Sequence, residues 1–132
     1  MADTAVANVA LVAATGEDHH ILLTTGLGTA IVHANTHVIT PTGPLEDMVI
    51  MVRNTEGSTN VVTVKAGDNP PADAAGLGDL ALTTIAATTG MIILPPLSSA
   101  RFLQDNGTVR ITVESNMTGY IIAMQRPSTK EV

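Results

Sequence analysis

The apolar stretches of this sequence are short, and turn-forming residues separate them. Runs such as 47–53, 91–94 and 119–125 are rich in Val, Ile and Met, and Gly, Pro, Asn or Asp lie between the runs. β-Branched residues favour pleated strands, and short strands with regularly spaced turn signals are typical of a sandwich or barrel. We therefore expect an all-β chain of about eight to ten short antiparallel strands, folded as a single β-sandwich or jelly-roll domain.

The length of 132 residues suits one domain with its own core. That core must be aliphatic, because the chain has no Trp, one Tyr and one Phe. We expect an N-terminal arm at 1–8, the β-sandwich or jelly-roll domain at 9–125, and a C-terminal tail at 126–132. The tail contains Pro, Ser, Thr and charges without a hydrophobic partner.

Two segments give more detailed expectations. Residues 47–53 carry apolar side chains at odd and even positions alike, which predicts a central strand covered on both faces. Asp105-Asn106-Gly107 is a strong hairpin signal, because Asn-Gly supplies positive φ at both central positions of a type I′ turn. We expect strands at 100–104, 108–114 and 119–125 to form a meander.

Charge and composition exclude several functions. The net charge is −6 and the six Lys and Arg residues are scattered, so the phosphate backbone of a nucleic acid has no basic patch to bind. No apolar run approaches the roughly 20 residues of a membrane span, and the first residues lack the features of a signal peptide. We expect cytoplasmic synthesis and no membrane partner. The absence of cysteine excludes disulfides and thiolate sites.

Histidines are the main candidates for chemistry near neutral pH. The chain has the pair His19-His20, and His33 with His37 at a spacing that spans a predicted strand end and loop. Surface or interface histidines explain them better than a metal site does, because no Asp or Glu lies between His33 and His37. Their burial between subunits would make assembly sensitive to pH.

A calcium site is a weaker alternative in the longest predicted loop, residues 67–78. Asp68, Asn69 and Asp73 would supply oxygen ligands, but their spacing matches no EF-hand and the prolines explain the loop without an ion. We predict no metal and no cofactor.

Nothing in the sequence indicates an enzyme. No serine lies in a Gly-x-Ser-x-Gly elbow, and no phosphate-binding loop or dinucleotide fingerprint is present. The adjacent Glu46 and Asp47 would point to opposite faces of a strand, so they cannot act as one acid/base pair. We predict no catalytic residues.

The apolar surface is larger than a small sandwich can hide, which predicts a homo-oligomer, with a trimer favoured. Its seam could include Met48, Ile50, Ile92 and Ile122, although the pattern does not show which face of each strand is buried.

A series of strand and turn segments in the second half of the chain carries a resemblance to a family. The segments are Val61–Pro71, Gly78-Asp79-Leu80, Ile93–Leu97, Arg101-Phe102, Asp105-Asn106-Gly107 and Thr118-Gly119. Together, over about residues 45–125, they resemble small tailed-phage virion proteins that decorate capsids as cement or head-stabilising proteins.

The resemblance implies a cysteine-free β-sandwich or jelly roll that forms trimers on the outer surface of an icosahedral head and ties neighbouring major capsid subunits together. It places the protein in the virion. Residues 1–7 or the tail at 126–132 would reach a neighbour and add a strand to an exposed edge. Two alternatives remain: a receptor- or carbohydrate-binding module of a head fibre or tail, and a cupin-like metal-binding jelly roll with His20, His33 and His37 as ligands.

Overall fold

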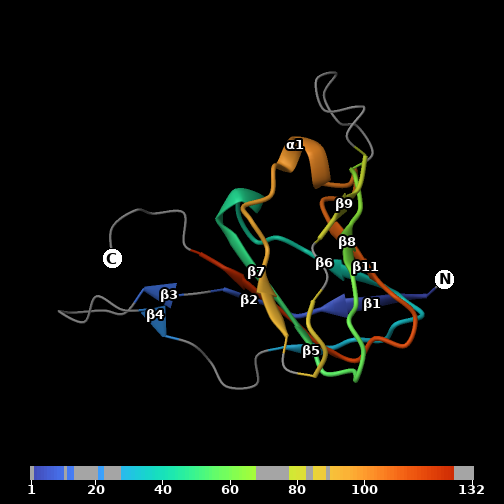
Figure 1. Cartoon of the computed structure of the whole chain (residues 1–132). Coiled ribbons are helices and arrows are strands. Elements are labelled where there is room, and N and C mark those ends of the chain that lie inside the picture. Colours follow the sequence, from blue (N-terminus) through green and yellow to red (C-terminus); the bar gives the residue numbers. More distant parts are fainter. Residues whose placement is uncertain are drawn as a thin grey trace.

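Two long strands with alternating side chains set the architecture, which we describe from a computed structural model (Figure 1). β7 (Met48–Asn54) and β12 (Gly119–Gln125) pair antiparallel along their whole length. Every second side chain of each strand is buried, because side chains of a strand point alternately to its two faces. The predicted strands at 47–53 and 119–125 are thus confirmed to within one residue.

The structure describes residues 2–10, 12–13, 21–22, 28–67, 78–82, 85–88 and 90–126. Its remaining strands are β1 (Asp3–Val6), β2 (Asn8–Ala10), β3 (Val12–Ala13), β4 (Ile21–Leu22), β5 (Thr29–Ala30), β6 (Thr36–Ile39), β8 (Val62–Val64), β9 (Leu80–Ala81), β10 (Met91–Ile93) and β11 (Val109–Val113). A 3₁₀ turn, η1 (Leu45–Asp47), and one helical turn, α1 (Ser99–Phe102), complete the elements.

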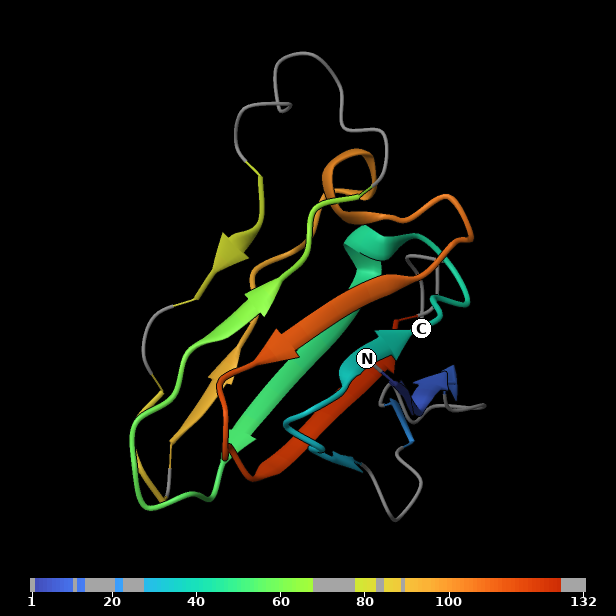
Figure 2. The same ribbon diagram turned by 90° about the vertical axis from the view of Figure 1, so that its right-hand side faces the viewer.

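The strands form two main sheets that pack as a β-sandwich (Figure 2). The first sheet has the order β1-β6-β11-β8-β9, and the second has the order β10-β7-β12-β2, with β5 also paired to β12. β3 and β4 form a small separate pair. The predicted all-β sandwich is confirmed, whereas the more specific jelly roll is not.

Aliphatic side chains fill the space between the sheets, as the composition predicted. The buried residues of this core, all aliphatic except Phe102, are Val6, Ile39, Leu45, Met48, Ile50, Val52, Val62, Val64, Ile85, Leu94, Leu97, Phe102, Val109, Ile111, Met117, Ile121 and Ala123. Both sheets contribute, so each sheet covers the inner face of the other.

The N-terminal segment joins both sheets. β1 pairs with β6 and β2 pairs with β12, and both pairs are parallel. The chain crosses between the sheets at Ala7, whose N–H donates to Thr29 Oγ1 at 3.0 Å. Residues 3–8, expected as an arm outside the domain, therefore lie within its sheets, and the expectation of antiparallel pairing fails at these two edges.

The meander prediction is wrong. β11 lies in the first sheet and β12 in the second, and residues 99–102 form α1 instead of a strand. The turn at 105–107 is present, but Gly107 has a positive φ of 80° and Asn106 does not, so it is not the expected type I′ turn. The N–H of Gln104 and the carbonyl of Thr108 close it at 2.8 Å. Residues 68–77 of the long loop and 127–132 of the tail lie outside the described residues.

A buried amide fastens the end of β7. Asn54 is fully buried, and its Nδ2 donates to the carbonyls of Ser58 at 2.9 Å and Ala86 at 3.2 Å. Its Oδ1 accepts from the N–H of Glu56 at 3.0 Å and from Asn60 Nδ2 at 3.3 Å. One side chain thereby satisfies backbone groups of two loops that run between the sheets.

Candidate functional site

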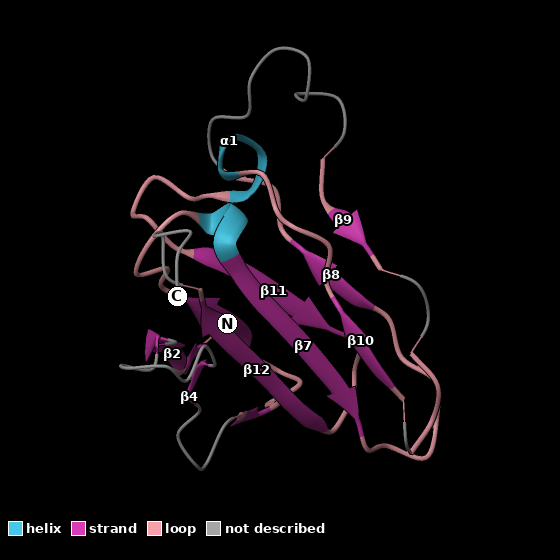
Figure 3. Ribbon diagram, turned by 90° about the vertical axis from the view of Figure 1, so that its left-hand side faces the viewer, coloured by secondary structure: helices cyan, strands magenta, loops and turns pink. Residues whose placement is uncertain are grey.

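The face of the second sheet that points away from the first sheet is the candidate site. We call it the outer face and define it by eight side chains on three strands. Figure 3 shows the ribbon of these strands from outside. The eight side chains are Val49, Met51 and Arg53 of β7, Met91 and Ile93 of β10, and Tyr120, Ile122 and Met124 of β12.

Strand register places these side chains in rows across the sheet. Ile93, Met51 and Ile122 oppose one another in one row, and Met91, Arg53 and Tyr120 form the next. Directly opposed side chains on one face of an antiparallel pair lie in contact distance. The outer face is therefore a contiguous and mainly apolar surface, interrupted by Arg53, rather than a set of scattered residues.

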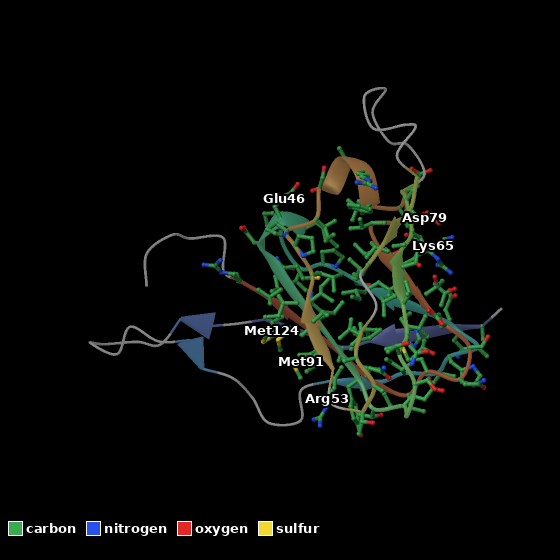
Figure 4. The ribbon with its side chains drawn as sticks, viewed as in Figure 1. Glu46, Arg53, Lys65, Asp79, Met91 and Met124 are labelled. Atoms are coloured by element: carbon green, nitrogen blue, oxygen red, sulfur yellow. The ribbon has the colours of Figure 1, made fainter. Side chains whose placement is uncertain are left out.

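The outer face is exposed. Ile93 is 65% exposed, Met91 49% and Tyr120 47%, and its other apolar members are partly buried. Figure 4 shows Met91, Met124 and Arg53 on this side of the molecule. Contiguous apolar surface of this kind is typical of interaction sites.

The opposite face of the molecule has a different character. On the outward side of the first sheet, Thr63 opposes Thr112, and Arg110 opposes Val38. Arg110 forms an ion pair with Asp3 at 2.7 Å. Ion pairs and hydroxyls suit contact with water, so within the described part of the chain the apolar outer side belongs to the second sheet.

β7 illustrates the difference between the expectation and the structure. It is a central strand, as predicted, because it lies between β10 and β12. The first sheet covers only its inner side, so the apolar residues on its other side belong to the outer face. Of the predicted seam, Met48 and Ile50 lie in the core and Ile92 packs against it, whereas Ile122 is on the outer face.

The two described histidines do not converge on a metal. His33 is exposed, whereas His37 is fully buried and its Nε2 accepts the N–H of Val32 at 3.0 Å. Burial lowers the pKa of His37, and a contact with the backbone of Ile111 partly offsets that effect. A neutral imidazole suits this position, because protonated Nε2 would face another donor.

The other candidates for a site have structural roles or are not described. The described residues contain no cluster of three metal-ligating side chains, while His19, His20, Asp68, Asn69 and Asp73 lie outside them. Among the helices of the described part of the chain, none is long and apolar enough to span a membrane.

Glu46 and Asp47 lie in η1 rather than on the expected strand. Glu46 binds the first residue of α1: its carboxylate accepts the Ser99 N–H at 3.0 Å and the Ser99 hydroxyl at 2.7 Å. These hydrogen bonds, the backbone one foremost, hold the pKa of Glu46 below its usual value. This carboxylate thus holds η1 against α1, an arrangement that the sequence did not indicate.

Asp79 fastens the start of β9 in the same way. It accepts the Ala66 N–H at 2.7 Å and forms an ion pair with Lys65 at 2.6 Å (Figure 4). The backbone bond and then Lys65 hold the pKa of Asp79 below its usual value. Both Glu46 and Asp79 accept backbone N–H groups of another segment and hold that segment in place, which is a structural role.

Comparison of the chain with protein-family models, with curated proteins and with solved structures found no match.

Proposed function

We propose that this chain is a structural protein that works by binding and assembly, as a decoration protein on the outer surface of an icosahedral phage head. In this role it would clamp neighbouring major capsid subunits as a homo-oligomer. The observation that carries the proposal is the apolar outer face, which supports a role in binding. The likeness of residues 45–125 to capsid decoration proteins supplies the identity of the partner.

The size of the outer face bears on how such a protein would bind. Seven-residue strands are about 24 Å long, and three strands span roughly 14 Å, so the footprint is on the order of 300 Å². A standard interface buries about 800 Å² on each partner. The outer face would therefore be the centre of a larger contact, or one of several contacts in a multivalent assembly where each further contact forms at high effective concentration.

The chemistry of the outer face favours an apolar partner surface. Arg53 is its one charged member, although the chain as a whole carries a charge of −6. Depletion of charge at the centre of a patch is the compositional signal of an interface core. Acidic residues elsewhere on the surface would oppose nonspecific binding to the packaged nucleic acid.

The test is co-sedimentation of the purified protein with heads of the phage that encodes it. We expect saturable binding at a fixed ratio to the major capsid protein. Ile122→Lys should weaken binding at least about tenfold, because it places a charge in the centre of the apolar patch.

Thr112→Lys is the matched control, since Thr112 has a similar exposure on the outward side of the first sheet. Heads that bind neither the wild type nor the control would refute the decoration role. Equal binding by all three proteins would refute the role of the outer face.

A further inference from the structure

β10 is an edge strand with unpaired backbone groups along its free side. The N–H of Asn54 donates to Gly90 O at 2.8 Å, and the N–H of Leu94 donates to Ile50 O at 2.9 Å. Hydrogen-bonded and non-hydrogen-bonded pairs alternate in an antiparallel ladder, so Ile92 is the next residue that bonds to β7. The N–H and C=O groups of Met91 and Ile93 therefore point away from β7, and β10 pairs with no other described strand.

Within its three residues, this edge carries neither the charges nor the bulges that often protect an exposed strand. Its side chains are Met, Ile and Ile, with no charge, and no bulge interrupts its register with β7. Ile93 and Met91 are the two most exposed large hydrophobic side chains of the described residues. Edges of this kind are templates for pairing with another strand, unless Lys, Pro or a covering segment blocks them. Pro95 and Pro96 limit the free edge to a short length.

We propose that the β10 edge pairs with the β10 edge of a second copy of this chain, antiparallel and about a two-fold axis at Ile92. In this register Met91 of each copy faces Ile93 of the other, and the two residues exchange both backbone hydrogen bonds. The pairing satisfies all eight outward N–H and C=O groups with four hydrogen bonds. The second sheets of the two copies become one continuous sheet.

The residues at both ends of β10 fit this register. Gly90 of one copy faces Leu94 of the other, where the Leu94 side chain is already buried in its own core and the backbone of Ala86 fills the space beside Gly90. The next outward position is Pro95, which has no N–H to leave unsatisfied. Met91 and Ile93 of the two copies lie side by side on the joined outer face, where each covers part of the other.

Electrostatics permit the contact. Arg53 is the charged side chain that faces β10 from the neighbouring strand, where it opposes Met91. In the pair, the two Arg53 residues lie three strand spacings apart, or about 14 Å across the sheet alone. That distance exceeds the Debye length of about 8 Å at physiological salt. The remaining repulsion comes from the net charge of −6 on each copy, so added salt should strengthen the pairing.

This inference does not depend on the phage role. A two-fold contact produces even-numbered assemblies, whereas a trimer would need a different contact on the outer face. The measured mass of the particle distinguishes the two, and head binding tests the decoration role separately.

The experiment is sedimentation equilibrium over a wide concentration range, with wild type, Ile93→Pro and Tyr120→Lys. We expect a reversible dimer for the wild type. Ile93→Pro should raise the dissociation constant at least about tenfold, because two hydrogen bonds are lost, one in each copy. The N–H that proline removes is not used in the bond to β7, so the fold should survive. Tyr120→Lys lies on the outer face two strands from the edge and should dimerise like the wild type.

Amide hydrogen exchange gives a second readout. Met91 and Ile93 amides should gain protection as concentration rises, while the Ile92 amide, already bonded to Val52, should not change. If circular dichroism shows that Ile93→Pro is unfolded, the double variant Met91→Lys with Ile93→Lys replaces it. A wild type that stays monomeric, a trimer, or a dimer that the edge variants leave intact would overturn the proposal.

Discussion

Gly119 is the position where a single methyl group should cost the most. It begins β12 with a φ of +143°, which side chains rarely adopt, and it faces Asn54 across the β7–β12 ladder. A Cβ there would overlap the carbonyl oxygen of Arg53 and lie 2.9 Å from its carbonyl carbon. The conformation costs about 1–3 kcal/mol for a residue with a Cβ. The overlap forces a backbone shift that costs about 1–3 kcal/mol more. We therefore expect Gly119→Ala to lower the free energy of unfolding by about 4 kcal/mol.

Three other glycines separate the two causes. Gly107 has a φ of +80° and open space, so Gly107→Ala should cost only the conformational part, about 1–2 kcal/mol. Gly67 has no positive φ, but a Cβ would overlap the backbone of Leu103, so Gly67→Ala should cost about 1–3 kcal/mol. Gly57 has neither problem, and Gly57→Ala should be neutral or slightly stabilising.

The assay is urea unfolding followed by circular dichroism, with the free energy taken from midpoint and slope. The effects of Gly107→Ala and Gly67→Ala should add approximately to that of Gly119→Ala. A loss for Gly119→Ala no greater than that for Gly107→Ala would show that β7 and β12 separate at this end without cost. The reasoning about close approach would then be wrong.

Two further predictions concern buried polar groups. Burial lowers the pKa of His37 below its ordinary value of 6.5, so below about pH 6.5 the unfolded chain binds a proton that the folded chain excludes. The contribution of neutral His37 to the free energy of unfolding should be fully present above that pH. It should fall by up to about 1.4 kcal/mol per pH unit as the pH decreases towards the pKa of the folded state. His37→Gln should flatten this part of a plot of urea midpoint against pH. Asn54→Asp should destabilise the protein by about 3 kcal/mol at pH 7, because a carboxylate would replace the amide donor that faces carbonyls of Ser58 and Ala86. The difference in free energy of unfolding between Asn54→Asp and the wild type should shrink in acid, where the protonated carboxyl can donate one hydrogen bond. A difference in urea midpoint that does not change with pH would contradict this account.

The sequence predicts strands well where the spacing of apolar residues and the positions of turn-forming residues indicate the same segment, as in β7 and β12. It does not show which side of such a strand is buried. Met48 and Met51 are chemically identical, and a shift of one residue in register would exchange their positions. The buried side is decided by pairing with distant strands, and Met48 and Ile50, which were named as possible seam residues, belong to the core.

Local composition also misleads where tertiary contacts decide the outcome. Residues 99–102 become helical where Glu46, about 53 positions earlier in the chain, binds the Ser99 N–H at the start of the turn. The buried state of His37 depends on the Val32 amide, and no spacing in the sequence distinguishes it from the exposed His33. The apolar outer face was predictable as an excess of hydrophobic residues, but its location was not.

The place of β12 between β7 and β2 also has a consequence for synthesis on the ribosome. β7 has an apolar residue at nearly every position, and its partner Gly119 follows Asn54 by about 65 residues. At about 5–20 residues per second, β7 leaves the ribosome several seconds before β12 is available. The second sheet cannot close during that time, and pairings between such distant segments form slowly in any case. During that interval the apolar side chains of β7 lack the partner that pairs with the whole length of the strand.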